Sequence, residues 1–137
     1  MLLLCRLEGD ELARTFFRMV ATDPPTTWDF LSQGARRQPP PRQDAEFLEA
    51  WRGLSVLDSF SVVRQNARKL RWRHGEFIAI LSIPDDAPFT YKGPEHRGHW
   101  MIYDAHGEML TEEGAELLRR WCVVRVVHGP STEDVTL

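Results

Sequence analysis

Cysteine is scarce in this chain: Cys5 and Cys122 are the only two, and neither belongs to a CxxC pair or to a Cys/His spacing typical of zinc sites. Two cysteines so far apart do not form the disulfide framework of small secreted domains. Both lie in apolar strings that resemble strands, so buried, reduced thiols are the favoured interpretation. We therefore expect a cytoplasmic protein without a structural metal.

Long hydrophobic runs are also missing. The apolar stretch Met1–Leu4 is followed at once by Arg6, Glu8 and Asp10. It is too short for the core of a signal peptide or for a membrane span. The sequence predicts no association with membranes.

Several sequence motifs that define enzyme classes are absent. The chain has no Walker loop, no GxGxxG, no HExxH and no nucleophile elbow. Nucleotide hydrolases, Rossmann enzymes, zincins and α/β-hydrolases that carry those motifs are therefore disfavoured. Any site has to be inferred from scattered residues.

The composition is that of an ordinary globular domain. The chain has 137 residues, 42% hydrophobic and 27% charged, which is enough for one core and too little for two. Its 17 Lys and Arg residues against 20 Asp and Glu give a net charge of −3, so no global field attracts nucleic acid. We expect one domain over residues 1–128 and a mobile tail over residues 129–137.

Hydrophobic periodicity alternates between strand and helix patterns without a strict βαβ order. This predicts a single compact α+β domain, with a mixed or antiparallel sheet and three to four short helices. Strands are expected at 16–21, 54–57, 76–83, 89–92, 99–103 and 121–127. Helices are expected after the capping residues Thr26 or Thr27, Asp44, Asp58 or Ser59, and Thr111.

Three of these segments resemble the arginine-serine-glutamate ADP-ribosyltransferases in order and spacing, over roughly residues 14–128. They are an aromatic strand containing Arg18, a strand-to-helix segment containing Ser55, and the hydrophobic segment Phe77–Pro84. The resemblance implies an NAD-binding domain of the kind found in bacterial toxins, toxin-antitoxin systems and modifying effectors. Such a domain transfers ADP-ribose or cleaves nicotinamide from NAD.

The resemblance also implies roles for individual residues. Arg18 would contact the phosphates of NAD, since a guanidinium suits a pyrophosphate. Ser55, or else Ser59 or Ser61, would order the nicotinamide-ribose end. A late glutamate would stabilise the positive charge that develops as nicotinamide leaves. The Glu/Gln-x-Glu triplet of the family is missing near residues 121–127, and the substitutes are Glu108, Glu112 and Glu113.

Each of these residues also has a purely structural interpretation. Arg18 could extend from an edge strand and keep its charged end in water. Ser59 and Asp58 are good helix caps, and Glu112 suits the first turn of any helix.

A histidine-rich segment runs from Glu95 to Glu108. Alternation along its strand places His99 and Tyr103 on one face, where they could contact a nucleotide or a leaving group. The spacing of His96, His99 and His106 fits no standard zinc site, so loop residues without a ligand are the alternative.

A run of basic residues extends along the expected third helix towards and past its C-terminus, from Arg64 to His74. Its main members are Arg64, Arg68, Arg71 and the interleaved Trp72. Basic and aromatic side chains together suit RNA, although cations at a helix C-terminus are also ordinary. Two alternatives to an NAD-dependent enzyme therefore remain. One is a non-catalytic protein-binding module of the immunity or accessory type, and the other is an RNA-binding or RNA-modifying domain.

Overall fold

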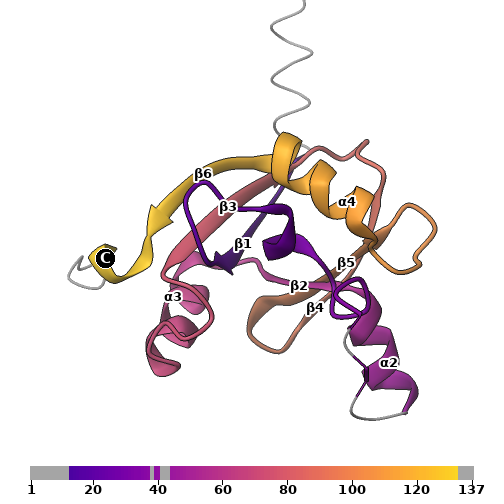
Figure 1. The fold of residues 1–137 in the computed structure, drawn as a ribbon, viewed down its shortest axis with the longest axis horizontal. Coiled ribbons are helices and arrows are strands. Elements are labelled where there is room, and N and C mark those ends of the chain that lie inside the picture. The colour runs from indigo at the N-terminus through magenta and orange to yellow at the C-terminus, as the bar shows by residue number, and fades with distance from the viewer. Residues whose placement is uncertain (1–12, 38, 41–43, 133–137) are drawn as a thin grey trace, which may run out of the picture.

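The structure is a computed structural model that describes residues 13–37, 39–40 and 44–132. Its centre is a six-stranded sheet in which every neighbouring pair is antiparallel, in the order β4-β5-β2-β1-β3-β6 (Figure 1). The predicted α+β class is confirmed. The strands are β1 (Arg14–Val20), β2 (Leu54–Leu57), β3 (Phe77–Ile83), β4 (Phe89–Glu95), β5 (His99–Asp104) and β6 (Val123–His128).

Short helices connect the strands. The α-helices are α2 (Ala45–Arg52), α3 (Phe60–Lys69) and α4 (Glu112–Leu117), joined by the shorter turns η1 (Thr27–Phe30), η2 (His96–Gly98), η3 (Leu118–Cys122) and η4 (Gly129–Thr132). Two predicted caps are confirmed, because the Asp44 side chain accepts from the Phe47 amide and that of Ser59 from the Val62 amide. Thr111 stands at the start of α4 without a capping side-chain bond.

The main core lies on one face of the sheet. Phe16, Leu81 and Ile102 point into it, and Phe30 of η1 and Leu118 of η3 cover them. Val63 and Ala67 of α3 are buried outside this core, where α3 packs on β1 and β2. Figure 1 shows α3 and α4 on opposite sides of the curved sheet. Burial on both faces explains why β3 reads as an almost continuous hydrophobic run.

Strand β1 has very different neighbours on its two sides. It pairs with β3 along all seven residues, from Arg14 opposite Ile83 to Val20 opposite Phe77. It pairs with β2 only at Phe17 opposite Leu57. The sheet therefore opens between β1 and β2, and this opening positions the site described below.

The two outer strands differ in chemistry. β4 carries Gly93 and Pro94 together with the charged Lys92 and Glu95. Such residues protect a free edge from pairing with another chain. β6 reads VVRVVH and pairs, within the described part of the chain, with β3 alone.

The C-terminal region departs from the sequence prediction. The final strand begins at Val123 rather than at Trp121, because residues 118–122 continue α4 as a π-helical turn. Gly129–Thr132 form a 3-10 turn where a mobile tail was expected, and the Gly129 amide donates to the Glu76 carbonyl at 2.7 Å. The rest of the expected tail, residues 133–137, lies outside the described residues, as does Cys5.

Candidate functional site

Arg18 lies at the opening between β1 and β2. Its Nε donates to the carbonyl of Asp29 at 2.7 Å, and its Nη1 donates to the carbonyl of Ser55 at 2.7 Å. The bond to Ser55 links β1 to β2 where their backbones do not pair, and the bond to Asp29 links β1 to η1. They fix the guanidinium in one orientation, with its remaining N–H groups free to meet a ligand.

A second guanidinium stands beside it. Arg36, from the loop after η1, donates from Nη2 to the Trp28 carbonyl at 2.9 Å and lies 5.0 Å from the centre of the Trp28 ring. Its Nε is buried and makes no hydrogen bond within the described part of the chain. A buried donor without a partner is costly, and an acceptor from a ligand would relieve that cost.

The electrostatics of this pair favour an anion. Burial and then the charge of Arg36 lower the pKa of Arg18 to about 10, against the opposing effect of Asp29. The Asp29 carboxylate is occupied, since it accepts from the backbone amides of Ala21 and Thr26. Among the described residues, no carboxylate forms an ion pair with either guanidinium. Two guanidiniums therefore face the same space without a direct ion pair among the described residues, although the charge of Asp29 acts on Arg18 from nearby.

That space is a row of three adjoining hollows. The first, of about 250 Å³, and the second, of about 300 Å³, share Arg18, Arg36 and Ser55 as lining residues, and His74 closes the first. The third, of about 440 Å³, shares His99 with the second and extends along α2 towards β4. Its polar lining residues are Asp44, Glu46, Glu49, Lys92, Glu95, His99 and Tyr103.

A serine and a histidine meet where the hollows join. Ser55 of β2 and His99 of β5 are diagonal neighbours, since Ser55 pairs with Met101 and Leu57 with His99. Ser55 Oγ lies 2.6 Å from His99 Nε2, a short hydrogen bond. The sequence predicted both residues as candidates from separate segments, and the sheet brings them together.

Tyr103 also lines this row of hollows, and its side chain is buried. It lines the third hollow, and its hydroxyl donates to the Glu49 carbonyl at 3.1 Å. Burial raises the pKa of this phenol above its usual value, with a further contribution from the Glu49 charge. Tyr103 thus remains a neutral hydrogen-bonding group at neutral pH.

The other predicted candidates lie elsewhere. Ser59 caps α3. Glu108 lies in the turn after β5, where its amide donates to the Asp104 side chain, and Glu112 lies in the first turn of α4 beside Thr27 and Glu116. None of the three lines the hollows around Arg18. The reason is that α4 packs its apolar side on the core, so its acidic first turn points away from the opening.

Of the acids that line the row, Glu49 was missed as a candidate, and Glu95 was named only as part of the histidine-rich segment. Glu49 bonds to Lys92 at 2.6 Å, while Glu95 stands opposite His99 in the β4–β5 pairing. Glu49 reads as the ordinary polar face of an amphipathic helix, so no local signal marks it. Arg36 lies in a polar loop after η1, where no local pattern marks it, and the packing of that loop places it beside Arg18.

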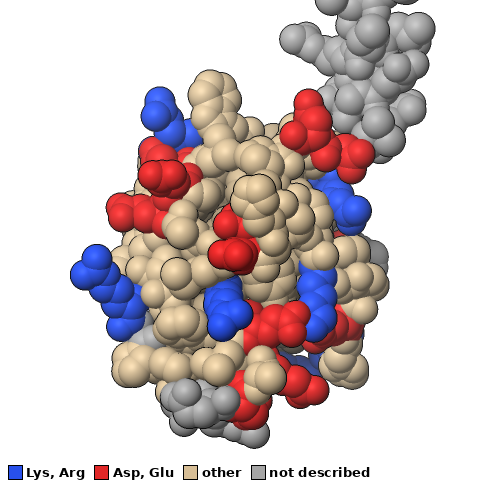
Figure 2. All heavy atoms as spheres, turned by 90° about the vertical axis from the view of Figure 1, so that its right-hand side faces the viewer, with Lys and Arg blue, Asp and Glu red and all other residues tan. Residues whose placement is uncertain are grey.

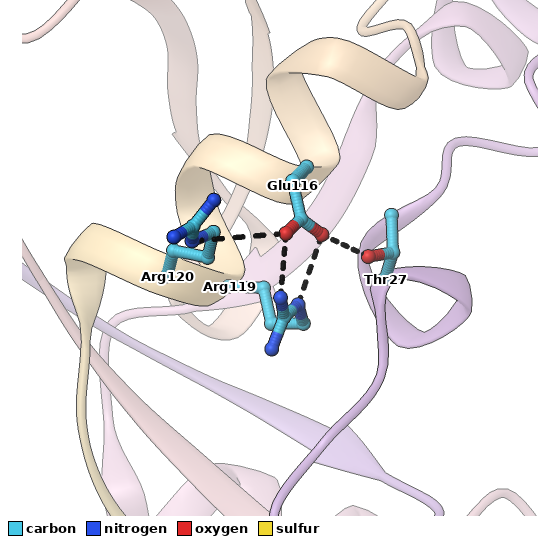
Figure 3. A network of polar contacts seen from close by, with 4 residues as sticks. All are labelled: Thr27, Glu116, Arg119 and Arg120. Carbon is cyan, nitrogen blue, oxygen red and sulfur yellow. Dashed lines mark hydrogen bonds and ion pairs between the residues drawn. The ribbon is translucent and has the colours of Figure 1, made fainter.

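A polar network supports η1 from the other side of the molecule (Figure 3). Glu116 of α4 accepts from the Thr27 hydroxyl and from Arg119, whose Nε lies at 2.9 Å, and Arg120 approaches it at 3.9 Å. The bonds to Arg119 and then Thr27 lower the pKa of Glu116 to about 2. The network ties α4 to the turn whose Asp29 carbonyl binds Arg18.

The basic run near α3 is separate from the hollows, except for His74. Arg64 donates to the Thr132 carbonyl at 3.0 Å, while Arg68 and Arg71 are exposed. The Trp72 ring lies against Gly129, where an added Cβ would come within 2.0 Å of it. Trp72 is therefore used in packing the C-terminal turn.

The face of the molecule that carries α2 and α4 shows no large area of one charge. Figure 2 shows Lys and Arg interspersed with Asp and Glu across it. No group of three His, Cys, Asp or Glu residues suited to a metal ion occurs in the described part of the chain.

Comparison with protein-family models, curated proteins and solved structures finds no match to this chain. Within residues 13–37, 39–40 and 44–132, none of the helices has the length and apolar character needed to cross a membrane. The function has to be inferred from the site itself.

Proposed function

We propose that the three hollows bind NAD and that the domain acts as an ADP-ribosyltransferase of the type its sequence resembles. The observation that carries this proposal is the pair Arg18 and Arg36. Two guanidiniums without a carboxylate partner in the described structure meet at an opening of the sheet. Guanidiniums in this arrangement suit the oxygens of a pyrophosphate.

The length of the row supports a dinucleotide rather than a single phosphate. The first and second hollows meet at the two arginines, and the third continues beyond His99. A pyrophosphate at the arginines would leave room for a nucleoside on each side. Ser55, His99 and Tyr103 would then offer hydrogen bonds to the ribose and the amide on the α2 side.

A carboxylate for the transfer step is available in the third hollow. Glu95 lines it and forms no ion pair with any of the described residues, whereas Glu49 is bonded to Lys92. We propose Glu95 as the group that stabilises the positive ribose carbon as nicotinamide leaves, in place of Glu108 and Glu112. Negative charge held next to a developing cation lowers the barrier of such a step.

Thermal unfolding tests binding directly, because a ligand that binds only the folded state stabilises it. We expect millimolar NAD to raise the Tm of the wild type and to leave Arg18→Ala unchanged. Arg125→Ala, which removes an exposed arginine from β6, is the matched control and should respond as the wild type does. Absence of a shift in the wild type would refute NAD binding at that concentration.

A protein-binding module is the second candidate, and a specific surface favours it. Trp121 of η3 is 73% exposed, and Val124 of the adjoining strand β6 is 62% exposed. Exposed aromatic residues are enriched in protein interfaces. A partner of the immunity or accessory type would cover this surface and leave the hollows free. RNA is a weaker alternative, because Trp72 is packed on Gly129.

We also propose a cytoplasmic location. Cys122 is a free and buried thiol, and burial raises its pKa to about 11. Such a thiol is inert and is compatible with a reducing compartment.

A further inference from the structure

We propose that Ser55 is a nucleophile that attacks phosphorus, with His99 as its general base, and that the substrate is a nucleotide phosphoanhydride. This inference rests on the anion site of the proposed function, but it assigns a different reaction to it. The bond that breaks is a P–O bond of the pyrophosphate rather than the bond to nicotinamide.

The first support is the geometry of the pair. Ser55 Oγ and His99 Nε2 are 2.6 Å apart, which is the contact that a histidine needs to take the proton of a serine. Ser55 is exposed to the hollows and His99 is half-buried beside it. A serine is a weak nucleophile alone and becomes effective only with such a base.

The second support is the contrast with the other serines of the fold. Ser32 is buried and donates to the Leu110 carbonyl at 2.9 Å. Ser59 accepts from the Val62 amide as a helix cap. Their hydroxyls hold the backbone, whereas the Ser55 hydroxyl bonds to a side chain that can accept a proton. Ser131 makes a similar contact, 2.7 Å from His128 Nδ1, but it lies outside the three hollows, so Ser55 is the serine of such a pair that stands beside Arg18.

The third support is the position of the positive charge. Arg18 is anchored on Ser55 itself, through the 2.7 Å bond from Nη1 to the Ser55 carbonyl, and Arg36 lines the same two hollows. A phosphate bound by these guanidiniums therefore lies beside the Ser55 hydroxyl. The same charges would offset the negative charge that builds on the phosphate oxygens in the transition state.

The reaction has two balanced steps. Ser55 Oγ forms a bond to phosphorus as the anhydride P–O bond breaks, and His99 takes the serine proton and passes it to the leaving phosphate. Water then attacks the phosphorus of the nucleotidyl-serine intermediate, the bond from this phosphorus to Ser55 Oγ breaks, and the second nucleotide is released. His99 takes the proton of the water and passes it to Ser55 Oγ. With NAD the products are AMP and nicotinamide mononucleotide, and no oxidant or metal enters the balance.

Product analysis with NAD separates this inference from the proposed function. We expect the wild type to release AMP and nicotinamide mononucleotide. The rate should fall by about 100-fold or more in Ser55→Ala and in His99→Gln, as expected when a general base is removed. Ser131→Ala, which removes an exposed serine of η4 that lies 2.7 Å from His128 and outside the three hollows, is the matched control and should keep the wild-type rate.

Two further outcomes are decisive. Release of nicotinamide and ADP-ribose alone, or NAD binding without any product, would overturn the inference and leave the NAD site in place. A fluorophosphonate probe provides the converse test. Labelling of Ser55 that requires His99 and is suppressed by inorganic phosphate would support the nucleophile even if NAD fails to bind. An unlabelled Ser55 in a chain that also cleaves no NAD would refute it.

Discussion

The two sides of β1 show how one strand can serve both stability and function. Towards β3, backbone pairing is continuous over seven residues. Towards β2, a single pair forms, and the Arg18 side chain supplies the hydrogen bonds to the neighbouring carbonyl groups. Where the backbones of two strands pair, their N–H and C=O groups are used up and none is left for a ligand. Where a side chain bonds to the neighbouring carbonyl instead, its remaining N–H groups can bind a ligand. The candidate site is located where regular pairing stops.

The largest effect is expected on the β3 side. Leu81 is fully buried in the main core, so Leu81→Ala should destabilise the fold by about 2–5 kcal/mol. Urea denaturation measures this, with the exposed Val124→Ala as a control expected to change by less than about 0.5 kcal/mol. A small loss in Leu81→Ala would show that the β3 side is not the rigid half of the sheet.

Arg18→Ala should have the next largest effect. It leaves the carbonyls of Asp29 and Ser55 without their donor, which we expect to cost about 1–3 kcal/mol. It should also abolish stabilisation by NAD. Arg18→Lys keeps a positive charge but cannot make both bonds, so it should recover little of either property. Full stability in Arg18→Ala would mean that β1 and β2 do not depend on this side chain.

Ser55→Ala should change stability by only about 0.5–1.5 kcal/mol, the contribution of one hydrogen bond. The main-chain carbonyl that binds Arg18 is kept in this variant. Urea denaturation of Ser55→Ala beside Ser61→Ala measures the difference. A loss as large as that of Leu81→Ala would indicate that Ser55 holds the sheet together and would weaken its assignment to chemistry.

The smallest effect on stability is expected from a change in the network of Glu116, Thr27 and Arg119, which holds η1 in place. Because the folded pKa of Glu116 is lowered to about 2, its contribution to stability is present above pH 4.5 and is lost as the pH falls towards 2. Glu116→Gln should therefore be less stable than the wild type at pH 7 and equal to it near pH 2. Urea midpoints across this range test the trend, and a constant difference would exclude Glu116 as its cause.

The parts of the fold that the sequence predicts are those with local causes. Asp44 and Ser59 cap their helices, and the apolar run of β3 marks a strand buried on both faces. The start of β6 was misplaced by two residues because the pattern of residues 118–122 fits a strand as well as a helical turn. In the structure these residues continue α4 as a π-helical turn.

The site was predicted only in part, and the reason is physical. Arg18, Ser55 and His99 are conspicuous because each is polar within an apolar strand. Arg36 and Glu49 are polar residues in a loop and on a helix face, where polarity is the rule. Their place beside the hollows follows from long-range packing, such as the bond from the Gly34 amide to the Trp51 carbonyl at 3.0 Å. No short window of sequence contains that information.

The unequal edges of the sheet have a consequence for handling the protein. The outer strand β4 carries Lys92, Glu95 and a proline, which disfavour pairing with a strand of another chain. The outer strand β6 consists mainly of valines with one arginine, so its free edge can pair with such a strand. At the concentrations used for NMR or crystallisation, this edge is where we expect chains to adhere to one another and eventually to aggregate. Val124→Lys would place a gatekeeper charge there, and a longer shelf life of concentrated samples would be its practical benefit.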